Sequence, residues 1–154
     1  MSSAPELLTA AAIAAMPAQS KVHPLNANAI RLHKSLGDAT GLSQFGFHLV
    51  TVLPGRESTE YHRHLYEEEC VYIVSGRGEA TIGDRTYTVG PGDFMGFPRR
   101  GAAHTMINNG SEPLVYLLAG PRAEHDVCDY PRKGKRLHYN GEDRAYVDLP
   151  KSDE

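Results

Sequence analysis

Two histidines separated by one residue, His62 and His64, stand shortly before three consecutive glutamates at 67–69. On a β-strand, residues two positions apart project from the same face, so the two imidazoles would be neighbours there. A third histidine, His104, begins another strand-like run far along the chain. Three imidazole nitrogens and one carboxylate oxygen make a mixed donor set that suits Fe, Mn, Co, Ni or Zn. These residues are therefore a candidate site for a divalent transition metal.

Each half of this pattern also has an ordinary explanation. Histidine pairs of this kind are common on exposed strands, and adjacent glutamates usually form a solvated patch. Here the glutamates lead directly into an apolar run at 70–75. An unpaired carboxylate buried there would destabilise the fold unless a cation or hydrogen-bond donors compensated it. The position of the glutamates before an apolar strand thus favours a metal site. The spacing of the residues alone leaves open which glutamate belongs to it.

Short apolar runs dominate the middle of the chain, and glycine, proline, aspartate and asparagine separate them. Because no segment of helical periodicity lies among these runs, they predict an antiparallel barrel or sandwich. Gly83 and Asp84 are typical of a two-residue hairpin turn. The expected strands are 45–53, 70–75, 79–82, 86–89, 94–97, 104–108 and 114–120.

Three segments are expected along the chain. Residues 1–43 should form a short helix and an extended arm, in which Thr9 caps the helix and Pro17 ends it. Residues 44–120 should form the β-barrel, and residues 121–154 a C-terminal extension packed on it.

Both faces of the expected strand 70–74 are apolar. Val71 and Ile73 share one face, while Cys70, Tyr72 and Val74 share the other. If the first face points into the barrel, the second still needs cover, and the N-terminal arm or a second subunit could provide it. The pattern therefore predicts a homodimer.

Composition excludes several classes of partner. The net charge of -3, from 16 basic and 19 acidic residues, provides no electrostatic footprint for nucleic acid or for an anionic membrane. The alanine-rich run after Glu6 is short and lacks a basic leader, so we expect neither a signal peptide nor a membrane span. Cys70 and Cys128 show no disulfide framework, which favours a cytoplasmic protein with reduced thiols.

Two ordered motifs in this chain resemble those of the cupin superfamily. The first motif of that superfamily is glycine, a spacer, HxH, glutamate and glycine, and the second is glycine, proline, glycine, histidine and asparagine. The first reads here as Gly55, His62, His64, Glu69 and Gly76. The second reads as Gly92, Pro98, Gly101, His104 and Asn108. The flanking sequence is similar to small single-domain bacterial cupins that are labelled, on similarity alone, as sugar phosphate isomerases.

The resemblance implies an all-β fold, the cupin double-stranded β-helix or jelly-roll barrel. It also implies that His62, His64, Glu69 and His104 hold the metal. The six residues between Glu69 and Gly76 select this glutamate, which also shares the face of Val71 and Ile73. Glu68 is the alternative ligand, on the opposite face.

A metal-dependent enzyme acting on a small oxygen-rich metabolite is the leading expectation, with isomerase, lyase or dioxygenase chemistry. The alternative is a non-catalytic protein that binds or senses a metal or small ligand. Candidate catalytic residues are His48, Tyr61 and Tyr72. Candidates to hold an anionic group of the substrate are Arg56, Arg63, Arg99 and Arg100.

Overall fold

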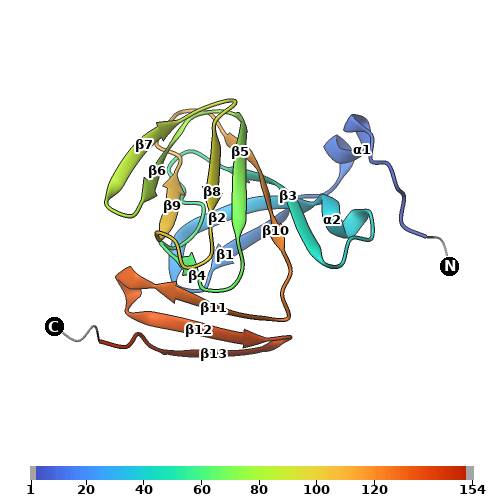
Figure 1. Ribbon diagram of the computed structural model, residues 1–154. Helices are drawn as coiled ribbons and strands as arrows, with labels where there is room; N and C mark the ends of the chain where they lie inside the picture. Colours follow the sequence, from blue (N-terminus) through green and yellow to red (C-terminus); the bar gives the residue numbers. More distant parts are fainter. Residues whose placement is uncertain (1–2, 152–154) are drawn as a thin grey trace.

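A computed structural model describes residues 3–151, and strands dominate it (Figure 1). Its helices are all short, and none of those within the described range has the length and hydropathy to cross a membrane. The helical elements are α1 (Ala10–Ala15), α2 (Leu36–Ala39) and the 3-10 turn η1 (Pro131–Lys133). The strands are β1 (Gln19–His23), β2 (Asn26–Ser35), β3 (Phe45–Val52), β4 (Arg63–His64), β5 (Glu69–Ser75), β6 (Gly78–Ile82), β7 (Arg85–Val89), β8 (Phe94–Phe97), β9 (His104–Ile107), β10 (Leu114–Pro121), β11 (His125–Tyr130), β12 (Lys135–Asn140) and β13 (Asp143–Asp148).

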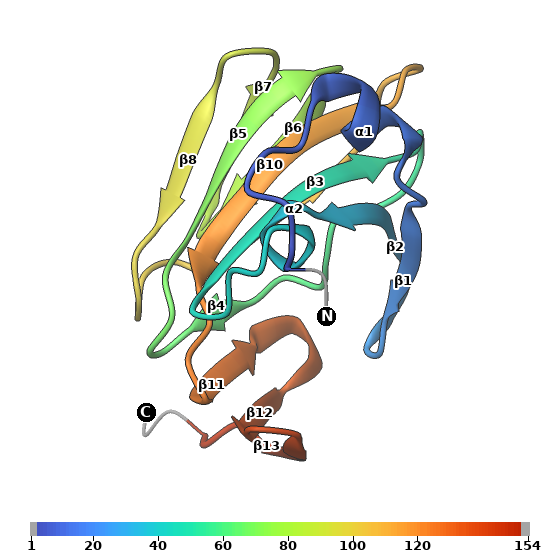
Figure 2. The same cartoon turned by 90° about the vertical axis from the view of Figure 1, so that its right-hand side faces the viewer.

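The strands of residues 3–151 form three antiparallel sheets. Six strands form the largest sheet in the order β1-β2-β3-β10-β5-β8, and three form a second sheet in the order β7-β6-β9. Side chains of both meet in one core, where Val50, Ile73 and Tyr116 of the large sheet pack with Ala80 and Met106 of the small one. The third sheet, in the order β13-β12-β11-β4, lies beneath this barrel in Figure 1. Figure 2 shows the strands of the large sheet edge to edge.

Strand β5 has one buried and one exposed face, as the alternation of its side chains requires. Val71 and Ile73 are 3% and 0% exposed, whereas Tyr72 and Val74 are 46% and 45% exposed. Glu69, at the start of the same strand, shares the inward parity of Val71 and Ile73. The strand therefore directs this glutamate, rather than Glu68, toward the interior.

A helix cap and glycine turns fix several boundaries of the helices and strands. The Thr9 hydroxyl accepts a hydrogen bond of 3.1 Å from the Ala12 amide at the start of α1, as expected for a cap. The predicted hairpin joins β6 to β7 with Ile82 opposite Arg85, and Gly83 supplies the positive φ of 60° that the turn needs. Gly76 has a φ of 78°, and an added Cβ would collide with the carbonyl oxygen of Pro113.

Asn108 of the second motif is a structural residue. Its side chain is fully buried, and its amide nitrogen donates to the carbonyl oxygens of Val52 and Glu112, both at 2.8 Å. Its side-chain oxygen accepts from the Gly110 amide at 3.0 Å. Because all these partners are backbone groups, Asn108 ties the loop after β9 to the neighbouring strand β3.

Both ends of the described chain contain more strand than the sequence indicates. Part of the expected arm forms the hairpin β1-β2, which extends the large sheet by pairing β2 with β3. The expected C-terminal extension forms three successive strands, and β11 pairs with β4, where Cys128 lies opposite His64. Polar residues such as Gln19, Ser20 and Lys21 hide β1 in the sequence, because this strand lies at a sheet edge and is mostly exposed.

Candidate metal centre

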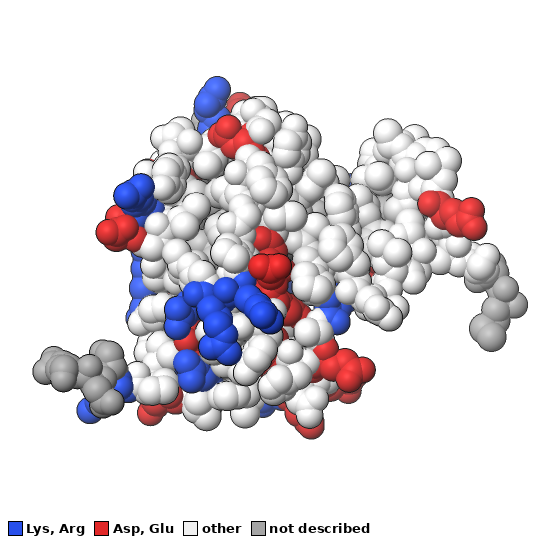
Figure 3. All heavy atoms as spheres, in the orientation of Figure 1, with Lys and Arg blue, Asp and Glu red and all other residues white. Residues whose placement is uncertain are grey.

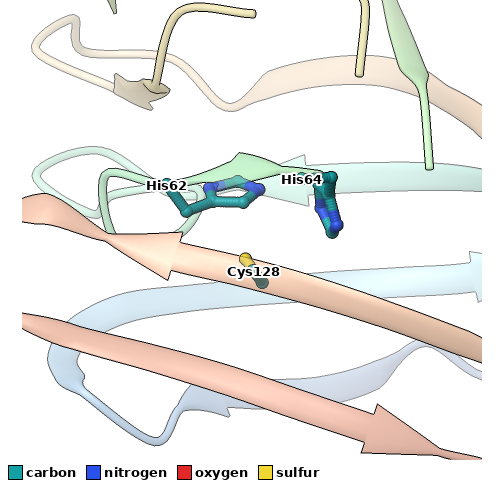
Figure 4. A group of neighbouring side chains, drawn as sticks. All are labelled: His62, His64 and Cys128. Carbon is teal, nitrogen blue, oxygen red and sulfur yellow. The ribbon is translucent and has the colours of Figure 1, made fainter. Parts of the chain in front are cut away.

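The HxH pair lies beside His104 although about 40 residues separate them in sequence. A β-bridge joins His62 to His104, with the His104 amide donating to the His62 carbonyl oxygen at 2.8 Å. The ring centroid of His62 is 5.0 Å from that of His64 and 4.6 Å from that of His104. Figure 4 shows the first two rings on the side of their strand that faces β11. Backbone pairing thus gathers the three imidazoles.

Glu69 completes the group. Its Oε1 atom lies 3.2 Å from His62 Nε2, 3.7 Å from His64 Nε2 and 2.7 Å from His104 Nε2. The two preceding glutamates make other contacts: Glu67 accepts a hydrogen bond from the Ala123 amide at 2.9 Å, and Glu68 accepts one from the Arg99 amide at 3.4 Å. Of the three adjacent glutamates, only Glu69 lies within 3.7 Å of the Nε2 atoms of all three histidines, while an oxygen of Glu67 lies within 4.8 Å of one ring nitrogen of His64.

The outer nitrogens of the three rings all face acceptors. His62 Nδ1 lies 2.9 Å from the Glu60 carbonyl oxygen, and His104 Nδ1 lies 3.4 Å from the carbonyl oxygen of Ala102. His64 Nδ1 lies 2.6 Å from Asp126 Oδ2. Carbonyl and carboxylate oxygens only accept, so these contacts favour a proton on each Nδ1. With the proton there, each Nε2 lone pair is available to a metal; without a metal, Nε2 of His62 and His104 can instead carry a proton and donate it to Glu69.

Burial and charge act in opposite directions on these groups. Burial would raise the pKa of Glu69, but hydrogen bonds from His104 and His62 hold that pKa well below its usual value. Burial lowers the pKa of His62 and outweighs the effect of Glu69. Burial also acts to lower the pKa of His64, yet the hydrogen bond to Asp126 raises it overall. An ionised carboxylate and three imidazole Nε2 atoms thus lie together at short range.

Asp126 is a residue of the candidate site that the sequence did not reveal. It is fully buried at the second position of β11, and its Oδ1 accepts from the Val127 amide at 2.8 Å and from the Tyr66 amide at 3.1 Å. Its other oxygen holds His64 Nδ1. No motif or spacing marks this aspartate, because the pairing of β11 with β4 alone brings it to the site.

Cys128 lies next to the same rings. Its sulfur and one ring nitrogen each of His62 and His64 all lie within 4.8 Å of one another, and Figure 4 shows the sulfur on the side of β11 toward them. Burial raises the pKa of the thiol to about 12, so it stays protonated near neutral pH and is a weak donor to a metal. Both cysteines are free.

A cavity of about 480 Å³ opens from the three histidines and Glu69 and lies between the large sheet and the C-terminal sheet. Of the predicted catalytic candidates, His48 lines it. Tyr61 does not, because its hydroxyl donates to the Gly83 carbonyl oxygen and its ring packs under Arg132. Tyr72 is on the outer face of β5, away from the cavity.

None of the four predicted anion-binding arginines lines this cavity. Arg56 donates to Asn28, and Arg63 lies 3.6 Å from Asp129. Basic side chains do gather on the surface near β4, above β11, in Figure 3. The arginines that line the cavity come from segments where the sequence drew no attention: Arg31, Arg122 and Arg144.

The protein is therefore a β-barrel in whose cavity three imidazoles and one carboxylate converge. Residues 48–120 match the family model described as Cupin domain. The chain belongs to the cupin superfamily, and the predicted all-β cupin fold is confirmed.

Three known proteins are similar to this chain in sequence or structure. A solved structure from Acidithiobacillus ferrooxidans, provisionally named a sugar phosphate isomerase, is 49% identical with a TM-score of 0.92, covering 96% of this chain and 97% of that one. A sugar phosphate isomerase of the cupin superfamily from Silicibacter pomeroyi is 27% identical with a TM-score of 0.77, covering 88% and 90%. An uncharacterized protein of Methanocaldococcus jannaschii is 31% identical over 52% of this chain, and the match spans only 56% of that curated relative.

Proposed function

We propose that His62, His64, Glu69 and His104 bind one divalent transition metal and that the protein is a metal-dependent enzyme acting on a small oxygen-rich metabolite. One observation carries this proposal: three Nε2 atoms converge on a single carboxylate oxygen, at 2.7 to 3.7 Å. Each Nδ1 also faces an oxygen acceptor, so with the ring protons held there the three Nε2 lone pairs and the Glu69 carboxylate would all be free to bind one cation. That cation would take the place of the Nε2 protons that otherwise donate to Glu69.

The donor set and the spacing both fit one ion. Two donor atoms about 2.1 Å from the same ion are about 3.0 Å apart when their bonds are perpendicular. Two of the three Glu69 contacts, at 3.2 and 2.7 Å, lie near this value, and the third, to His64, is 3.7 Å. Imidazole nitrogen with one carboxylate suits Fe, Mn, Zn, Ni or Co rather than a hard oxygen-seeking ion such as Ca²⁺. The residues present therefore fit such a metal.

A metal bound here would supply Lewis acidity toward a carbonyl or carboxylate oxygen. The protein's own groups would do the rest. Asp126 orients His64, and His48, which lines the cavity, is placed to accept and return a proton. Tyr130 and Leu137 wall the cavity on the side of the C-terminal sheet and limit the access of water. The names of the two similar solved proteins favour isomerisation of a sugar phosphate over lyase or dioxygenase chemistry.

Protein purified without a histidine tag is expected to contain about one transition-metal ion per chain. Elemental analysis measures this directly. In D₂O, NMR should show wild-type protein interconverting aldose and ketose phosphates with uptake of deuterium, and a His62→Ala variant should not. Absence of stoichiometric metal overturns the proposal. Metal binding without turnover of any small oxygen-rich substrate assigns the chain to a non-catalytic binding or sensor role.

We also propose that the protein is a homodimer that pairs through the outer face of the large sheet. Tyr72 and Phe94 lie opposite each other on β5 and β8 and are 46% and 65% exposed. Phe45 and Val74, on the same sheet, are also exposed. Helix α1 contains no buried residue and stands off the barrel in Figure 1, so it is available to reach a second copy. A face this apolar is typical of an interface.

Sedimentation velocity tests the dimer. Wild-type protein is expected to sediment as a dimer, and Phe94→Asp should weaken dimerisation at least about tenfold because it buries a charge at the interface. Tyr87→Asp is the matched control, since Tyr87 is an exposed aromatic residue on β7 of the other sheet. A monomeric wild type, or equal effects of the two substitutions, contradicts the prediction.

A further inference from the structure

Acidic and basic side chains both line the cavity. Glu67 and Glu68 accompany Glu69 in its lining. Two of the basic residues are Arg31 of β2 and Arg122 after β10. A cavity with this polarity suits a ligand with one end that coordinates a metal and another that carries negative charge.

Arg31 is an uncompensated cation. It lies on β2 opposite Lys21, a second basic residue, and it forms no ion pair with any carboxylate of residues 3–151. The nearby hydroxyl of Tyr116 does not offset the charge, because burial raises the pKa of that hydroxyl to about 12 and it stays neutral. A half-buried guanidinium in this position can donate several hydrogen bonds to an incoming oxyanion.

His48 and Arg122 converge beside the same wall. Gly46 lines the cavity next to them, and a Cβ added there would lie 3.4 Å from His48 Nε2 and 3.5 Å from Arg122 Nε. The lack of a side chain at Gly46 therefore leaves the two groups open toward the cavity. Arg122 is only partly neutralised, since its partner Asp38, at 2.5 Å, is largely exposed to solvent.

Two buried nitrogens near this wall have no protein partner among the described residues. They are His48 Nδ1 and His33 Nε2, and the two rings lie 5.6 Å apart. His33 is 93% buried, so its unpaired nitrogen carries a real desolvation cost. Burial lowers the pKa of His48, and the charges of Arg122 and Arg31 lower it further. An anion bound in the cavity beside Arg31 and Arg122 would relieve the repulsion between these positive charges and His48.

We propose that Arg31 and Arg122, beside His48, form an oxyanion subsite, which binds a phosphate or carboxylate group of the substrate while another part of the substrate reaches the metal. The guanidinium fork of Arg31 matches two oxygens of either group. The inference rests on the proposed function for the metal end alone, because the subsite itself needs no metal. It specifies a substrate with a terminal anion and excludes neutral sugars and polyols.

Isothermal titration of metal-free, chelator-dialysed protein tests the subsite. Inorganic phosphate should bind, and Arg31→Gln should weaken its affinity at least about tenfold, equivalent to about 1.4 kcal/mol. Arg31→Lys should recover only part of the loss, because lysine lacks the fork. Arg85→Gln, at an exposed arginine of β7 outside the cavity, should have no effect. Parallel titrations with acetate show whether the subsite prefers phosphate or carboxylate.

Equal phosphate affinity in wild type and Arg31→Gln, or the absence of binding to wild type, overturns the subsite. Circular dichroism checks that each variant folds. If Arg31→Gln unfolds, Arg122→Gln is the second test, because it breaks only the partly exposed pair with Asp38. It should show a smaller loss of phosphate affinity. Metal uptake without phosphate binding overturns this inference alone. Phosphate binding without metal uptake supports it and overturns the proposed function.

Discussion

Replacing Glu69 with glutamine should abolish stoichiometric metal binding, whereas the same change at Glu68 should not. Glu69 Oε1 is the point at which the three Nε2 atoms converge, so the substitution removes both a ligand atom and the only negative charge among them. An uncharged amide oxygen is a poor substitute for a carboxylate beside a divalent cation. We expect the dissociation constant to rise at least about hundredfold, equivalent to about 2.7 kcal/mol.

Competition with a chromophoric chelator measures the dissociation constants, and elemental analysis measures the bound metal. Glu68→Gln is the matched control, because it makes the same chemical change one residue away, where the side chain contacts the Arg99 amide instead. It should leave both measurements unchanged. If Glu68→Gln loses the metal and Glu69→Gln retains it, Glu68 is the ligand and the inward parity of Glu69 has no bearing on the site.

Local patterns were sufficient to predict the seven strands expected between residues 45 and 120, although not β1, β2 or β4. The expected strand 70–75 corresponds to β5, and the expected strand 114–120 corresponds to β10. Turn residues mark such boundaries: Gly76 after β5 and Gly83 between β6 and β7 need a positive φ that few other residues tolerate. Alternation along β5 placed Glu69 on the inward face with Val71 and Ile73, and that placement depends only on the period of a strand.

The C-terminal sheet and the basic wall could not be predicted in this way. Asp126 reaches His64 because β11 pairs with β4, and this pairing joins segments that are about 60 residues apart. Arg31 and Arg122 come from opposite parts of the chain and meet only in the folded protein. The sequence directed attention to arginines near the motifs, such as Arg63, yet proximity in sequence does not place a side chain inside a barrel.

Replacing Asp126 with asparagine should weaken metal binding about 10- to 100-fold without contacting the metal. The new side chain can still accept through its oxygen from the amides of Val127 and Tyr66. Its nitrogen, however, is a donor and would face the Nδ1 proton of His64, so the imidazole must rotate or move its proton to Nε2. In either case His64 no longer presents a lone pair to the metal, and the cost is about 1.4 to 2.7 kcal/mol of binding free energy.

Asp129→Asn separates this positioning role from a loss of fold stability. Asp129 is also buried on β11, but it lies on the opposite face of the strand and pairs with Arg136 at 2.6 Å and Arg63 at 3.6 Å. Thermal unfolding of metal-free protein should show destabilisation in both variants, because each weakens buried hydrogen bonds. Chelator competition should show weaker metal binding only in Asp126→Asn. Equal metal affinities in the two variants would mean that Asp126 stabilises the sheet and does not position His64.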